Sequence, residues 1–288
     1  MKSSSFDYHL ATDVDDAIAA LSQAEEGKAI AGGQSLVALM SFRLARPDVL
    51  VDINGIDELD YIEARPDGGL AIGALTRQRA LERSELVRQR CPIMAEAVPQ
   101  IAHAVIRNRG TIGGSLAHAD SASELCTISL AVDARMKVRG PNGDREIAAI
   151  DFFQGPLTTA LEPDELLTEI VIPASPSGSG SAYQEVSRRK GDFALAGVGG
   201  VIALGDGGTV RHARLAYTSL GPTALRSPAA EEFLVGRRID DETIAGAIER
   251  LSGDLRPSES LHGTAEYRMH LAGALTKRVL VAAADRAA

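Results

Sequence analysis

Residues 109–120 read RGTIGGSLAHAD. Three glycines, Gly110, Gly113 and Gly114, fall close together beside two hydroxyl residues. Glycine costs backbone entropy and is favoured where a chain bends sharply or lets another group approach closely. So many glycines are not typical of a helix or a strand interior. We therefore expect a loop that a ligand approaches.

A second stretch, AGGQS at residues 31–35, has the same composition as TIGGS at residues 111–115. Backbone N–H groups at such turns bind anions, and the start of a following helix adds a favourable dipole. A single Gly-Gly pair usually marks an ordinary turn. Two similar loops, each at the end of an expected strand, favour one ligand whose two phosphates lie between them.

Several familiar sites are excluded. The sequence has no G-x-x-x-x-G-K-[ST] and no G-x-G-x-x-G after the first strand, which disfavours a P-loop and a Rossmann nicotinamide site. Ser35 lies in GQSLV, which lacks the second glycine of a nucleophile elbow. The spacing of His103, His118 and Asp120 fits no metal motif. We predict no catalytic residue and no metal ligand.

The composition restricts the class of protein. The 288 residues are 45% hydrophobic and 24% charged, which suits one large or two ordinary globular domains. A net charge of -9 argues against a nucleic-acid-binding surface. No apolar run reaches the roughly 18 residues that span a bilayer, and the first residues lack an apolar signal-peptide core. We expect a cytoplasmic protein without a transmembrane segment.

The chain has two cysteines, Cys91 and Cys126, which are far apart. This number excludes a disulfide framework. It also excludes an iron–sulfur cluster of the usual kind, which needs about four thiolates.

The first 53 residues predict a βαβ-like unit. Asp13 is expected to cap a helix, and KAIAGG is expected to be a strand that ends in the first glycine turn. Ser35 is expected to cap a short helix, and VLVDI is a further strand.

Residues 54–175 predict an α+β region. We expect strands at GLAIGAL and LLTEIVIP, a hairpin at ARMKVRG-PNGD, a helix capped near Thr76, and helices around residues 93–97 and 124–131. The stretch ASPSGSGS, residues 174–181, cannot bury apolar surface and predicts a boundary with a linker at 176–181. Residues 182–288 then predict three strands followed by three helices, the last of which is expected from Thr264 to Ala287.

Four segments together resemble a known family: AGGQSL, RPDVLVDI, RNRGTIGGSLAHADSASEL and SRRKGDFA. They are similar to the FAD-binding medium subunit of the molybdenum-containing hydroxylases, and the resemblance covers nearly the whole chain. It implies an α+β fold of the vanillyl-alcohol-oxidase type, with FAD between two subdomains, residues 1–53 and 54–175. It also implies a smaller C-terminal domain, residues 182–288, with a three-stranded antiparallel sheet and helices.

The resemblance also implies the residues that bind FAD. The first diphosphate loop is Ala31, Gly32, Gly33, Gln34 and Ser35, followed by Leu36. The second is Gly110, Thr111, Gly113, Gly114 and Ser115. The remaining expected contacts are Ile101, His118, Asp120, Glu124, Leu167, Arg189, Lys190 and Phe193, of which Phe193 lies where relatives carry a tyrosine near the flavin ring.

The sequence departs from the family at three of these or neighbouring positions. Many relatives have Asn at the position of Ser115, some have Asp at that of Glu124, and the xanthine dehydrogenase flavin domain has lysine at that of Leu195. We expect individual contacts to differ there, and FAD binding to be kept.

The implied function is electron transfer. A partner with a molybdenum cofactor oxidises substrate, a small partner with two [2Fe–2S] clusters passes the electrons to this FAD, and an external acceptor takes them. The implied assembly is a dimer of heterotrimers. The alternatives are a stand-alone flavin oxidase or reductase of the same fold, and a nucleotide-binding regulatory module without a redox role.

Overall fold

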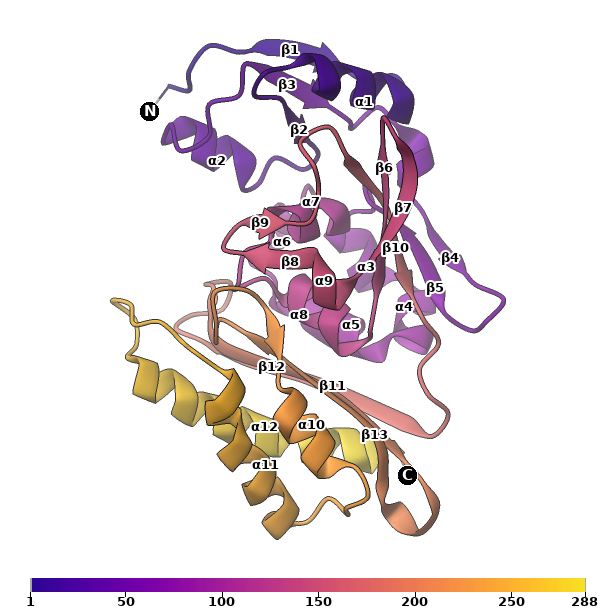
Figure 1. The fold of residues 1–288 in the computed structure, drawn as a ribbon, viewed down its shortest axis with the longest axis vertical. Coiled ribbons are helices and arrows are strands. Elements are labelled where there is room, and N and C mark those ends of the chain that lie inside the picture. The colour runs from indigo at the N-terminus through magenta and orange to yellow at the C-terminus, as the bar shows by residue number, and fades with distance from the viewer. Residues whose placement is uncertain (1, 288) are drawn as a thin grey trace.

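The structure is a computed structural model that describes residues 2–287. Three units follow one another along its long axis, from the N-terminal subdomain through a larger central subdomain to the C-terminal domain (Figure 1). Within these residues no helix combines the length and the apolar character that crossing a membrane requires.

The N-terminal subdomain is a small parallel sheet with two helices. Its strand order is β1-β3-β2, and both pairings are parallel. The Asp13 carboxylate caps α1 by accepting from the Asp16 N–H at 2.8 Å. The expected strand, glycine turn, helix and strand are therefore confirmed. The elements are β1 (Asp7–Leu10), α1 (Val14–Gln23), β2 (Lys28–Ile30), α2 (Leu36–Ser41) and β3 (Val49–Asp52).

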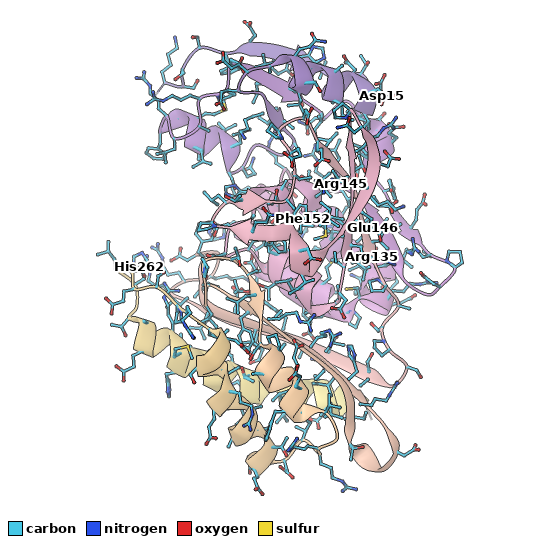
Figure 2. All side chains as sticks on the ribbon, viewed as in Figure 1. Asp15, Arg135, Arg145, Glu146, Phe152 and His262 are labelled. Carbon is cyan, nitrogen blue, oxygen red and sulfur yellow. The ribbon has the colours of Figure 1, made fainter. Side chains whose placement is uncertain are left out.

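The central subdomain is built on a five-stranded antiparallel sheet in the order β4-β5-β10-β6-β7. Arg135 and Glu146 pair across its β6–β7 edge at 3.4 Å, and Phe152 is buried beneath it (Figure 2). The strands are β4 (Ile62–Ala64), β5 (Leu70–Gly73), β6 (Arg135–Gly140), β7 (Gly143–Ala148) and β10 (Leu166–Ile172), with a separate hairpin of β8 (Phe153–Gly155) and β9 (Thr158–Thr159). The helices are η1 (Asp57–Leu59), α3 (Gln78–Arg83), α4 (Glu85–Arg90), α5 (Pro92–Ala97), η2 (Val98–Gln100), α6 (Ala104–Arg107), α7 (Ile112–His118), α8 (Glu124–Ala131) and α9 (Ala149–Phe152).

The C-terminal domain is an antiparallel sheet of four strands in the order β11-β12-β13-β14, with helices on its outer face. Three strands were expected. The fourth, β14, has two residues, too few to give a sequence pattern, and it pairs with Ala216 and Tyr217. The elements are β11 (Ser179–Ser187), β12 (Ala194–Leu204), η3 (Asp206–Gly208), β13 (Val210–Thr218), β14 (Leu225–Arg226), α10 (Pro228–Leu234), α11 (Asp241–Asp254) and α12 (Ala265–Ala287).

Strand β12 lies between the two domains and is buried on both faces. A Cβ on Gly199 would lie 3.4 Å from Ile93 on α5, whereas a Cβ on the next residue, Gly200, would lie 2.5 Å from Val279 on α12. Successive residues of a strand face opposite sides, so one face packs on the central subdomain and the other on the C-terminal helices. The hydroxyls of Thr127 and Thr218 join the domains at 2.7 Å. The domains therefore share a packed interface.

Four local expectations were wrong. Ser35 precedes α2, but its side chain does not cap the helix. The second glycine stretch is the first turn of α7 and not a loop. Helix α3 begins at Gln78, because the Thr76 hydroxyl donates to the Tyr61 carbonyl at 2.8 Å instead of capping the helix. The last three residues of the expected linker already belong to β11, where a Cβ on Gly180 would lie 2.1 Å from the Ala283 carbonyl of α12.

Candidate functional site

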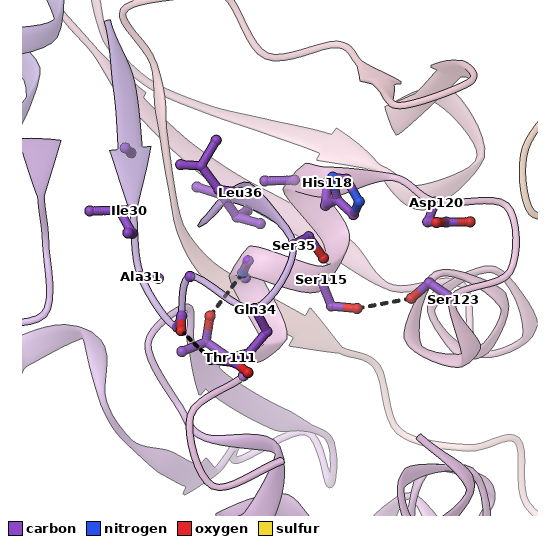
Figure 3. Close-up of a pocket in the computed structure, with 18 of the residues that line it drawn as sticks. Ile30, Ala31, Gln34, Ser35, Leu36, Thr111, Ser115, His118, Asp120 and Ser123 are labelled. Atoms are coloured by element: carbon purple, nitrogen blue, oxygen red, sulfur yellow. Dashed lines mark hydrogen bonds between the residues drawn. The ribbon is translucent and has the colours of Figure 1, made fainter. Parts of the chain in front are cut away.

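A cavity of about 740 Å³ opens where the three units meet. Its walls come from β2 and the loop after it, and from α7 and the segments on either side of it (Figure 3). The turn between β11 and β12 adds a further part of the wall. This volume lies within the range of ligand-binding pockets in proteins. The site therefore requires the packing of all three units.

The first glycine segment carries unused hydrogen-bond donors. The backbone N–H groups of Gly32, Gly33, Gln34 and Ser35 make no hydrogen bond to any part of residues 2–287. The Gln34 side chain folds back on the loop and donates to the Gly32 carbonyl at 2.9 Å (Figure 3). Ser35 occupies the position before α2, but its side chain makes no capping hydrogen bond. Successive free N–H groups form a site for an anion.

Glycine is required at this loop for two reasons. Gly33 has φ +71°, a left-handed backbone that favours glycine. A Cβ on Gly32 would lie 2.3 Å from the Arg109 carbonyl, which belongs to the second segment. The two glycine segments are thus in direct contact, although they are far apart in the sequence.

The second glycine segment differs from the first, because most of its N–H groups are already paired. Ile112 and Gly113 donate to the carbonyls of Thr76 and Ala74 at 3.0 and 2.9 Å, and Gly114 donates to the Thr111 hydroxyl at 3.0 Å. Gly113 and Gly114 give the cavity a stretch of wall without side chains. The segment also gives hydroxyls, of which that of Ser115 lies 2.9 Å from that of Ser123 (Figure 3).

Glu124 is a buried carboxyl group at the cavity wall. Burial, and after it the charge of nearby Glu185, together raise its pKa to about 8. The side chain is therefore mostly protonated at neutral pH and can donate a hydrogen bond. His118 and Asp120 line the same wall (Figure 3).

The cavity brings together the expected site residues, with two exceptions. Arg189 and Lys190 lie on the turn before β12 but do not line the cavity, and Arg189 instead pairs with Asp192 at 3.2 Å. Phe193 does line it and is 72% exposed.

The structure also adds wall residues that the sequence did not indicate. Lys28 on β2 and the segment 157–159 at the β8–β9 hairpin line the cavity. No motif marks them, since they reach the site through the packing of the units.

The donors and the walls fit an elongated anion with an apolar part. The free N–H groups suit phosphate oxygens. At Gly114 the absence of a Cβ leaves room for a ligand beside Ala31. Apolar surface from Ile101, Leu167 and Phe193 suits an aromatic ring system. These features fit the two phosphates and the flavin of FAD.

Known proteins match this chain along its whole length. The family model for the FAD binding domain in molybdopterin dehydrogenase matches residues 4–175, and that for the CO dehydrogenase flavoprotein C-terminal domain matches residues 181–283. The 6-hydroxypseudooxynicotine dehydrogenase complex subunit alpha of Paenarthrobacter nicotinovorans is 41% identical over 288 residues, which are 100% of this chain and 97% of that protein.

The carbon monoxide dehydrogenase medium chain of Hydrogenophaga pseudoflava is 40% identical over 285 residues, which are 98% of each protein. A solved structure of carbon monoxide dehydrogenase from the same organism, lacking the Mo-pyranopterin moiety of the molybdenum cofactor, has a TM-score of 0.96 at 41% identity and covers 100% of both chains.

The sequence, the fold and the residues of the cavity therefore all indicate the same family. The chain belongs to the family of FAD-binding medium subunits of the molybdenum hydroxylases, which are flavoprotein subunits of multi-subunit oxidoreductases, and its cofactor is FAD.

Proposed function

We propose that this chain is the electron-transfer subunit of a molybdenum-containing hydroxylase. It receives electrons from the [2Fe–2S] clusters of a small partner and delivers them to an external acceptor. A large partner with a molybdenum cofactor oxidises the substrate, and the complex is a dimer of heterotrimers. The observation that carries the proposal is a cavity whose donors and walls fit FAD, in a chain that has too few cysteines for a cluster of its own.

The two cysteines support this division of labour. Cys91 and Cys126 are buried, and burial raises the pKa of each thiol to about 12. Iron is bound by thiolates, and a cluster of the usual kind needs about four. The clusters that reduce the flavin therefore belong to another subunit.

The residues of the cavity bind and orient the cofactor. FAD, when bound, accepts electrons from a one-electron donor and releases them to another acceptor. The N–H groups of the first segment hold the diphosphate, and the bare wall at Gly114 lets it approach. Glu124 holds a proton on its carboxyl group beside the cofactor. Electron transfer of this kind needs no general base or nucleophile from the chain.

The domain division follows the same proposal. Residues 1–175 form the FAD-binding domain, with its subdomain boundary near residue 53, and residues 182–288 form the C-terminal domain. Their shared face through β12 keeps the β11–β12 turn, and with it Phe193, at the mouth of the cavity.

Co-purification of a tagged chain from its native cells tests the proposal. We expect a molybdenum-containing subunit and an iron–sulfur subunit in equal amounts with this chain, and FAD in the complex. A chain that purifies alone and turns over a small substrate would instead support a stand-alone flavin oxidase. A chain that binds a nucleotide without flavin colour would support a regulatory module.

A further inference from the structure

We infer that Asn54 and Arg77 position the loop that binds the diphosphate of FAD, residues 31–35, although neither side chain lines the cavity. The inference rests on FAD as the cofactor and is independent of the electron-transfer role proposed above.

Asn54 follows β3 and holds the first glycine segment. Its Nδ2 donates to the Ala31 carbonyl at 2.8 Å. The Asp52 carboxylate fixes the orientation of Asn54, because it accepts from the Asn54 backbone N–H at 2.9 Å and from Nδ2 at 2.6 Å. The Asn54 amide therefore has one defined direction.

Arg77 connects this amide to the second glycine segment. One guanidinium nitrogen, Nη2, donates to Asn54 Oδ1 at 2.8 Å, and the other, Nη1, donates to the Arg109 carbonyl at 2.6 Å. The Arg77 backbone also forms a β-bridge with Thr111. A continuous chain of hydrogen bonds thus runs from Ala31 through Asn54 and Arg77 to Arg109.

The chain of hydrogen bonds sets the direction of the free donors. In a trans peptide the carbonyl and the next N–H point to opposite sides. Because Asn54 holds the Ala31 carbonyl, the Gly32 N–H is held on the other side of that peptide. Gln34 holds the Gly32 carbonyl in the same way and so directs the Gly33 N–H.

Preorganised donors bind an anion without the cost of ordering the loop. This matters here because Lys28 is the one lysine or arginine among the cavity-lining residues that the structure describes. Correctly directed backbone dipoles must therefore provide most of the attraction for two phosphates. A side chain that directs them controls affinity without touching the ligand.

The test measures ligand binding by the full chain after FAD has been removed. We expect Asn54→Ala and Arg77→Lys to lower the affinity of the chain for FAD and for ADP by a similar factor, about tenfold or more. Each substitution removes hydrogen bonds that direct the loop. Lysine keeps the charge of Arg77 but cannot donate in two fixed directions. Riboflavin, which has no phosphate, is expected to bind both variants as it binds the wild-type chain.

The comparison of ADP with riboflavin separates positioning from a merely structural role, and thermal unfolding of the FAD-free variants shows that the chains are folded. Asn142→Ala is the matched control, because Asn142 is exposed in the β6–β7 turn. Unchanged affinity for FAD and ADP in Asn54→Ala and Arg77→Lys would overturn the inference. Equal losses for ADP and riboflavin would also overturn it, whether or not the unfolding temperature falls.

Discussion

Gly114 belongs to the second glycine segment and lies at the cavity wall, near Ala31 of the first segment. A Cβ there would lie 2.8 Å from the Thr111 hydroxyl and 3.9 Å from the Ala31 Cβ, so any side chain enters the space between them. We predict that Gly114→Val abolishes FAD binding, measured by absorbance titration of the full chain, while the C-terminal domain stays folded.

Gly253→Val is the control for this substitution. Gly253 lies in α11, far from the cavity-lining residues in the sequence, and a Cβ there meets no atom within 4 Å. This variant should bind FAD as the wild-type chain does. Stoichiometric FAD in Gly114→Val would show that the diphosphate lies elsewhere.

Glu124 predicts a pH dependence of stability. Its pKa is about 8 in the folded chain and 4.5 as the ordinary value. Below about pH 4.5 both states carry the proton, so the folded state has no penalty. As the pH rises toward 8 the unfolded state loses the proton first, so the free energy of unfolding falls, and it levels off above 8.

Replacement by glutamine removes this dependence. We predict that the FAD-free Glu124→Gln chain loses less stability than the wild-type chain between pH 5 and 8.5, by a difference on the order of 3 kcal/mol. Chemical unfolding at both pH values measures it, with the exposed Glu259→Gln as a control. Equal pH slopes in Glu124→Gln and the wild-type chain would mean that Glu124 ionises normally.

At the scale of residues, the sequence was informative wherever a local pattern carries the chemistry. The glycine pairs and most of the expected contacts line one cavity. The Asn54–Arg77 pair was missed, because its hydrogen bonds join residues 23 and 32 positions apart and leave no motif. Arg189 and Lys190 were expected from the resemblance, and neither lines the cavity.

Helix α7 shows why a glycine-rich element can be necessary. A Cβ on Gly113 would lie 2.5 Å from the Ala74 Cβ at the end of β5, so the helix can pack there only without a side chain. We predict that Gly113→Ala destabilises the chain by about 1–3 kcal/mol through overpacking, despite the better helix propensity of alanine. Chemical unfolding measures this change.

The matched substitution Gly253→Ala separates packing from propensity. Gly253 lies in a helix with open space around it, so alanine should raise stability there by up to about 1 kcal/mol. A gain in stability at both positions would contradict the close contact between α7 and β5.

At the scale of elements, the sequence predicted the helices and strands whose local sequence pattern favours the same structure as their packing does. The expected helix at residues 124–131 is confirmed as α8, and the expected helix from Thr264 is confirmed as α12. Helix α7 was missed, because the low helix propensity of glycine is overridden by the Thr111 cap and by contact with β5. The start of β11 was missed because serine and glycine are typical of linkers.

The whole molecule has a core that crosses the domain boundary. Tyr183, Val201 and Ala216 of the C-terminal sheet belong to the same buried cluster as the helices of the central subdomain. We predict that the full chain unfolds in one cooperative transition, with equal calorimetric and van't Hoff enthalpies in scanning calorimetry. Two resolved transitions would show that the domains are energetically independent.

FAD binding in the cavity between the three units can be tested on the purified full chain. Its visible spectrum is recorded, and the flavin that it releases on denaturation is identified. We predict flavin absorbance from one FAD per chain. A colourless chain that takes up no FAD on reconstitution would contradict it.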